Sequence, residues 1–225
     1  MISPLILTNV FTIGPVAVSA PVVTTWALMA LIGGGSFLAT RRLKMRPSKA
    51  QATLEMLVDA IDSQIREIVR VEPAPYRSLI GTIFVFTLCA NWLGLIPGLE
   101  PPTSRLETDA ALAGIVFVST IYFGVKNRGP LGYLKTFAEP TWAMLPLNIV
   151  EQITRTFSLI VRLFGNVMSG VFVIAVMLML AGLLVPIPLM ALELLTGAVQ
   201  AYIFAVLATV FIGAAVGEGT EGGRG

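Results

Sequence analysis

The sequence predicts an all-α integral membrane protein with about five membrane-inserted helices, including one amphipathic interfacial helix and a long tilted C-terminal helical hairpin. Of its residues 56% are hydrophobic and 12% are charged, whereas ordinary soluble domains carry about 25% charge. Several apolar stretches reach the length of about 20 residues that a bilayer crossing needs. Basic residues gather at the ends of these stretches, so the net charge of +2 does not indicate nucleic-acid binding. We treat residues 1–225 as a single membrane domain.

The first transmembrane helix is expected at residues 21–40, where an apolar stretch ends in the basic run RRLKMR. Basic loops mark the cytoplasmic side. Residues 49–71 follow a different pattern, with apolar side chains at helical spacing opposite charged ones, which predicts an amphipathic helix on the membrane surface or on a partner. Its apolar positions are Leu54, Leu57, Val58, Ile61, Ile65, Ile68 and Val69, and its charged positions are Glu55, Asp59, Asp62, Arg66, Glu67 and Arg70.

A transmembrane hairpin is expected next, with helices at residues 76–97 and 109–126. The connection PGLEPPTSRLETD contains proline, glycine and acidic residues, which suits a non-cytoplasmic loop. The following connection, KNRGPLGYLK, carries three basic residues and is placed in the cytoplasm. The N-terminus is therefore expected outside and the C-terminus inside. On this interpretation Asp59, Asp62 and Asp109, the last of which is the boundary residue of the second helix, are counted as lying outside the apolar spans.

The last two helices, at residues 140–181 and 189–216, are expected to form the tilted hairpin around the breaker GLLVPIPL. The first is too long to stand upright, since the part after Pro146 extends roughly 50 Å against about 30 Å of hydrocarbon. Polar residues three or four apart share one of its faces: Asn148, Glu151, Arg155, Ser158, Arg162, Asn166 and Ser169. The second helix carries Glu193, Thr196 and Gln200.

Arg162 is the most informative residue, because a fixed charge within an apolar stretch is costly in a bilayer. It either snorkels to a membrane face or serves a polar path, and its distance from the stretch ends favours the path. Antiparallel pairing sets Gln200 near the depth of Arg162 and Glu193 closer to the outer face. This layout predicts two aqueous half-channels separated by the arginine. Glu193 as a helix-end carboxylate, and Gln200, Asn166, Ser158 and Ser169 as interhelical packing groups, stay open as alternatives.

Four motifs resemble subunit a of the F-type ATP synthase membrane sector, and the match runs from Val22 to Val216. The resemblance implies that Arg162 is the stator arginine and that Asn166 and Gln200 line its surroundings. It also implies that the chain abuts a rotating ring of c subunits, whose carboxylates bind the ion, and that subunit b of the peripheral stalk is a further partner. The motifs are RLFGN at 162–166, PLN at 146–148, NWLGLIPG at 91–98 and QAYIFAVL at 200–207.

Departures from this family assign the outer ion relay to Glu193. Many members place an acid nine residues after the arginine, where this chain has Val171, and this chain contains no histidine. Glu193 stands where others carry histidine or glutamate. The segments SQIREI, EPAPY and LFGNVMSG are most similar to the N-ATPase branch, often inferred to move sodium. The resemblance implies the inner membrane of a prokaryotic cell, lipid contact, and no cofactor beyond the transported H+ or Na+.

Other functional classes fit the sequence less well. An intramembrane protease needs a nucleophile with its base, paired aspartates or a metal site, and no hydrolytic centre is visible. A voltage sensor repeats arginine every third residue along a span, whereas here only Arg155 and Arg162 share the polar stripe. A self-contained secondary ion transporter or channel remains the alternative, although no internal repeat is seen.

Overall fold

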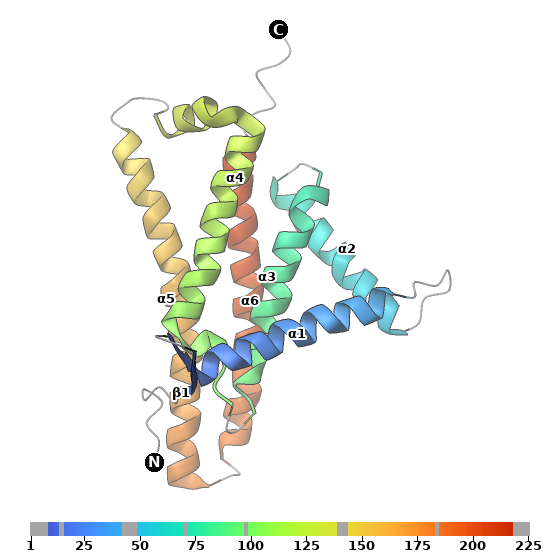
Figure 1. Cartoon of the computed structure of the whole chain (residues 1–225), viewed down its shortest axis with the longest axis vertical. Helices are drawn as coiled ribbons and strands as arrows, with labels where there is room; N and C mark the ends of the chain where they lie inside the picture. The colour runs from blue at the N-terminus through green and yellow to red at the C-terminus, as the bar shows by residue number, and fades with distance from the viewer. Residues whose placement is uncertain are drawn as a thin grey trace.

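Four long helices run side by side and form the body of the molecule (Figure 1). The computed structural model describes residues 9–13, 16–41, 49–69, 72–96, 99–138, 144–182 and 185–217. Within these residues five helices are long and apolar enough to cross a membrane, and the all-α membrane fold is confirmed. The amphipathic helix comes in addition to these five. The body consists of α3 (Ala74–Leu93), α4 (Leu106–Ala138), α5 (Met144–Ala181) and α6 (Pro186–Val216).

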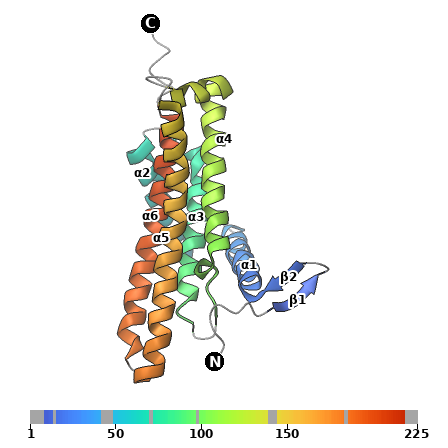
Figure 2. The same ribbon diagram turned by 90° about the vertical axis from the view of Figure 1, so that its left-hand side faces the viewer.

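A short antiparallel hairpin, β1 (Asn9–Ile13) and β2 (Val16–Ser19), precedes α1 (Ala20–Thr40) and was not predicted. It projects from the bundle beside the first turn of α1 (Figure 2). Helix α1 crosses the bundle at a steep angle instead of running along it (Figure 1). Most of the basic run after α1 lies outside the described residues.

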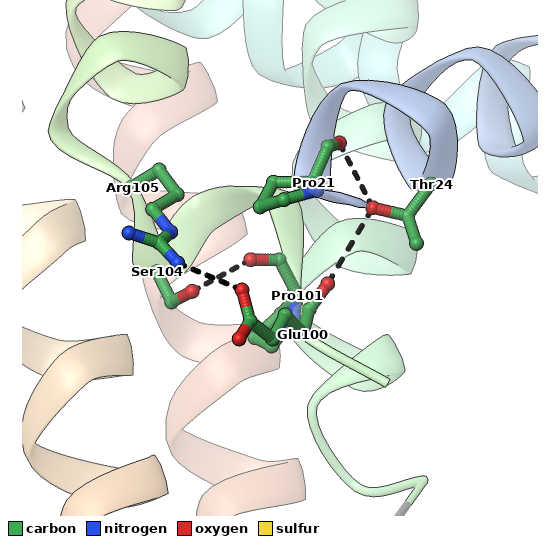
Figure 3. A network of polar contacts seen from close by, with 6 residues as sticks. All are labelled: Pro21, Thr24, Glu100, Pro101, Ser104 and Arg105. Carbon is green, nitrogen blue, oxygen red and sulfur yellow. Dashed lines mark hydrogen bonds and ion pairs between the residues drawn. The ribbon is translucent and has the colours of Figure 1, made fainter. Parts of the chain in front are cut away.

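The first turn of α1 is held against the connection between α3 and α4 (Figure 3). The Thr24 hydroxyl donates to the carbonyl oxygen of Pro21 at 2.9 Å and lies 3.5 Å from that of Glu100. The Glu100 carboxylate pairs with Arg105 at 2.8 Å. Two charged side chains in the described part of this connection thus bind each other.

Helix α2 (Lys49–Val69) packs its C-terminal half on the chain itself. Ile65 and Val69 are buried in a cluster with residues of α3 and α6, so the expected partner of this apolar face is partly the bundle. The N-terminal half keeps apolar side chains such as Leu54 and Val58 exposed. Asp62 was expected on the outward charged face, but it is 8% exposed and pairs with Arg77 of α3. Asp62 lies one helical turn before Ile65 and so faces the bundle as well. The guanidinium of Arg77 on the neighbouring helix compensates the charge of the buried carboxylate.

Helix α4 continues well past the predicted end at residue 126. The segment expected as a loop is a kinked helix, with Gly129 at φ 75° and Pro130 after it. Proline lacks the backbone donor and glycine adopts the positive φ, which together explain a sharp bend. The part after the kink lies across the end of the bundle (Figure 1). There the Tyr133 ring packs against Gly124, where a Cβ atom would lie 2.4 Å from it.

Helices α5 and α6 lie side by side along the bundle (Figure 2). Gly182, directly after α5, has a φ of 71°. The expected helices at 140–181 and 189–216 correspond to α5 and α6, although residues 139–143 lie outside the described part. The core between α3, α4, α5 and α6 is an apolar cluster, consisting of Ile83, Leu112, Ala113, Val116, Leu159, Leu163, Phe204, Ala208 and Phe211.

Asn91, in the NWLGLIPG segment, fixes the register between α3 and α6. Its side-chain amide donates to the carbonyl oxygen of Gly197 at 2.9 Å and accepts from the Thr103 hydroxyl at 2.9 Å. The neighbouring Trp92 indole donates to the carbonyl oxygen of Leu194 at 3.1 Å. Gly197 allows this approach, because a Cβ there would already lie 3.1 Å from that of Asn91. One asparagine therefore joins α3, α6 and the η1 turn (Pro102–Ser104).

Asn91→Ala is expected to lower the free energy of unfolding by about 1–3 kcal/mol, since the buried Thr103 hydroxyl loses its acceptor. The measurement is denaturation of the protein in detergent. Asn127→Ala is the control, because Asn127 is exposed and donates only within its own helix, to the Phe123 carbonyl oxygen. Equal stability of the two variants would contradict the role given to Asn91.

Candidate functional site

Arg162 lies on α5 at the surface of the chain, in a groove between α5 and α6. The groove has a volume of about 720 Å³ and also contains Ser158, Arg155 and Glu151 of the predicted polar stripe. Within the described residues no ion pair involves Arg162. A guanidinium without a counter-charge among the described residues is available to a negative group of a partner.

The stripe continues into a second cavity, of about 250 Å³, at the kinked end of α4. Glu151 and Arg155 form an ion pair one helical turn apart and line both this cavity and the groove. The Arg155 guanidinium also lies over the Phe211 ring, 5.7 Å from its centroid. Asn148 donates to the carbonyl oxygen of Phe137 at 2.9 Å, which joins α5 to the segment past the kink. These residues make a polar zone on one side of Arg162.

A third cavity, of about 210 Å³, lies on the other side of Arg162 along α5. It contains Glu193 and Asn166, together with Ser169, Thr196 and Gly170. The Glu193 carboxylate occupies the space beside Gly170, where a Cβ atom would lie 1.7 Å from Oε2. The carboxylate therefore fits at this place only because glycine at position 170 has no side chain.

The two hydroxyls of this cavity bond to the backbone. Ser169 donates to the carbonyl oxygen of Asn166 at 2.9 Å, and Thr196 lies 3.2 Å from that of Glu193. They do not bind the carboxylate, which stays available for an ion. Glu193 also lies two turns into α6, beyond the first turn where the helix dipole favours an acid. This position weakens the alternative of a helix-end carboxylate.

Not all predicted residues meet in these cavities. Gln200 is half-buried on α6 and lines none of the three. Its register, between Glu193 beside Gly170 and Phe211 beside Arg155, puts it at a depth between Arg162 and Asn166. Ser158 is exposed and its hydroxyl makes no hydrogen bond within the described part of the chain, but it lines the groove of Arg162.

Asp109 is the residue that the sequence interpretation missed. It was expected outside the spans, but it lies in the candidate span of α4 and its exposed fraction is 0%. Its position four residues before Ala113 and seven before Val116 could have revealed this, because that spacing places all three on one helical face. Neighbouring Glu107 is on the exposed side of α4.

Comparison with known proteins identifies the family to which this chain is similar. The family described as ATP synthase A chain matches residues 22–213. ATP synthase subunit a 2 of Bradyrhizobium sp. is 57% identical over 98% of this chain and 99% of its own length. ATP synthase subunit a of Albidiferax ferrireducens is 48% identical over 90% of this chain and 88% of its own. Subunit a 1 of Chlorobaculum parvum is 50% identical over 86% and 87%. A multi-pass membrane protein that matches these relatives over nearly its whole length belongs to the ATP synthase subunit a family.

Proposed function

We propose that this chain, as the stator subunit a of an ATP synthase, guides H+ or Na+ through two half-channels against a ring of c subunits. The observation that carries the proposal is the order of groups along the α5–α6 hairpin. The Glu193 cavity lies on one side of Arg162, and the Glu151–Arg155 zone lies on the other. Arg162 itself is exposed between them. Membership of the family is shown by the comparisons, whereas the ion path and the contact with the rotor are proposed.

The physical basis is the cost of charge in lipid. A rotor carboxylate that has bound its ion is neutral and can face lipid, whereas an empty one is charged and costs several kcal/mol there. The exposed guanidinium of Arg162 attracts the empty form and repels free cations, so it prevents a direct leak between the half-channels. Arginine keeps its charge in such a site more reliably than lysine.

Each half-channel has its own residues in this proposal. On the outer side, the Glu193 carboxylate accepts an ion in the cavity that it shares with Asn166, and passes it to the rotor. Gln200 lies near the depth of Asn166 and is proposed to line the same approach. On the inner side, the released ion leaves along Ser158, Arg155, Glu151 and Asn148. A membrane potential contributes about 2.3 kcal/mol per charge per 100 mV to these steps.

The proposal includes partners that hold the chain in place. The ring exerts torque on subunit a, so the peripheral stalk with subunit b is required to stop both from turning together. A self-contained secondary transporter remains the second candidate. In such a protein, however, a carboxylate of the same chain has to balance the positive charge of an arginine in the membrane. The exposed Arg162, without an ion pair in the described residues, favours a partner that supplies this charge.

The proposed orientation places the α3–α4 connection outside and the kink of α4 in the cytoplasm. In a Cys89→Ser background, Glu107→Cys is expected to react with an impermeant thiol reagent in intact cells. Lys126→Cys is expected to react only in inverted vesicles, because it lies just before the kink of α4, far from Glu107 along the helix, and both side chains are exposed. The reverse pattern would show that the orientation is wrong.

Arg162→Ala is expected to abolish ATP synthesis while passive ion leak through the assembled membrane sector persists or rises. The rotor carboxylate then has no counter-charge, and free cations meet no barrier. Arg162→Lys is expected to restore little, since it lacks the planar fork of donors. The measurement is ion flux and ATP synthesis in vesicles that contain the assembled complex. Coupled synthesis near wild type in the alanine variant would refute the stator role.

Glu193→Gln is expected to reduce ion-driven turnover by about 10² or more with assembly intact, because an amide cannot relay a proton or bind a cation tightly. Glu193→Asp should retain part of the activity. Gly170→Ala should also impair turnover, since the new Cβ displaces the carboxylate. Gly114→Ala is the matched control on α4, where a Cβ meets no atom within 4 Å. Normal flux in both Glu193→Gln and Gly170→Ala would remove Glu193 from the path.

A further inference from the structure

A narrow apolar groove lies where α2 diverges from the bundle, apart from the polar cavities of α5 and α6. Helix α2 packs on α3 and α6 through Ile65 and Val69, whereas its N-terminal half extends away from α3 (Figure 1). The groove between these three helices has a volume of about 110 Å³. Its apolar walls include Leu57 and Ile61 of α2, Ile80 and Phe84 of α3, and Ala205 and Val206 of α6.

The polar side chains that line this groove are bonded to the protein. The Thr209 hydroxyl donates to the carbonyl oxygen of Ala205 at 2.8 Å. The Tyr202 hydroxyl donates to Oε1 of Gln64 at 2.8 Å, which joins α6 to α2. An apolar cavity of this kind stays dry and takes apolar ligands, and one of about 150 Å³ binds benzene. The groove therefore suits an apolar occupant better than water.

The shape of the groove favours a single hydrocarbon chain. Leu54, Leu57 and Ile61 share one face of α2, so the exposed Leu54 extends the apolar wall towards the N-terminus of the helix. A helix of a partner protein is about 10–12 Å wide with its side chains, too wide for so small a groove. The flanking helices α3 and α6 are both candidate membrane spans. The chain that surrounds them is the acyl chain of a lipid.

The charges on α2 indicate which headgroup fits. Among the described residues, the exposed charged side chains of this helix are Glu55, Asp59, Arg66 and Glu67, three of them acidic. No lysine or arginine lines the groove. Amphipathic helices that bind anionic lipids are instead rich in basic residues. An acidic surface attracts an ammonium group, and the side-chain amide nitrogen of Gln64 can donate to an ester carbonyl.

We propose that this groove binds one acyl chain of a phospholipid whose headgroup carries an ammonium group, as phosphatidylethanolamine does. The headgroup lies at the acidic side of α2, in the leaflet that this helix occupies. The lipid completes the attachment of α2, which the chain itself secures through Ile65, Val69 and the Asp62–Arg77 pair. The site is independent of the ion path, because Arg162 and Glu193 line other cavities.

The first test locates a retained lipid in the assembled complex. Vesicles contain phosphatidylethanolamine with a photoreactive diazirine at the end of one acyl chain. The complex is extracted, washed with lipid-free detergent and irradiated, and the adducts on this chain are mapped by mass spectrometry. Adducts are expected on Leu57, Ile61 and Phe84, whereas the exposed Leu38 of α1 should lose its lipid in the wash. Phosphatidylglycerol with the same chain should give at least about fivefold fewer adducts.

A substitution that fills the groove gives the matched comparison. Ala60 lines the groove, so Ala60→Leu should reduce the groove adducts at least about tenfold. Ala52→Leu is the control, because Ala52 is exposed on the same helix and lies outside the groove. Unchanged adducts in Ala60→Leu would overturn the site, and so would their absence from the unsubstituted complex, the result expected if a partner subunit fills the groove. Equal labelling by phosphatidylglycerol would overturn the assignment of the headgroup.

A second test does not depend on whether position 60 tolerates leucine. In a Cys89→Ser background, Ala60→Cys is labelled with a maleimide in the complex depleted of lipid. Phosphatidylethanolamine added to saturation is expected to slow this labelling at least about tenfold, since the thiol reacts only while the site is empty. Ala52→Cys should react at the same rate with and without the lipid. Equal rates at Ala60→Cys would overturn the lipid site.

Discussion

A polar group that is surrounded by hydrocarbon must find a partner within the protein or in water, and this constraint shapes the whole molecule. The Asn91 amide meets it by binding Gly197 and Thr103, and thereby fixes how α3, α6 and η1 fit together. The Asp62–Arg77 pair meets it where α2 joins the bundle. Arg162 and Asp109 have no partner within the described residues. For Arg162 the proposed partner is a carboxylate of the rotor.

The sequence was sufficient for features that depend on length and period. Apolar lengths predicted the long helices, and the spacing of three or four residues predicted the stripe on α5 that lines the groove of Arg162. The pairing of Glu193 with Asn166 in one cavity agrees with the expected antiparallel hairpin. Their functional roles remain predictions. So does the assignment to the N-ATPase branch, because similarity to subunit a does not decide between branches of the family.

Other features depend on the phase of a helix or on contacts between distant segments, which composition does not reveal. The GP pair in KNRGPLGYLK was interpreted as a loop, but the helix resumes after a single positive φ at Gly129. Asp109 was expected outside the spans, and Asp62 was expected on the outward charged face of its helix. The position of each residue around its helix turns both side chains inward. The space beside Gly170 is equally invisible in a sequence, because it exists only once α5 and α6 are paired.

The auxiliary helices α1 and α2 lie on one side of the bundle and leave α5 uncovered on the other (Figure 1). A ring that docks against the α5 face would meet the Glu193 cavity and the Glu151–Arg155 zone at different heights and in a fixed lateral order. Because the fold exists in only one hand, that order cannot be exchanged. The sense of rotation would then be a property of the chirality of this chain, and reversal of the driving ion gradient would reverse the rotation without any change in the stator.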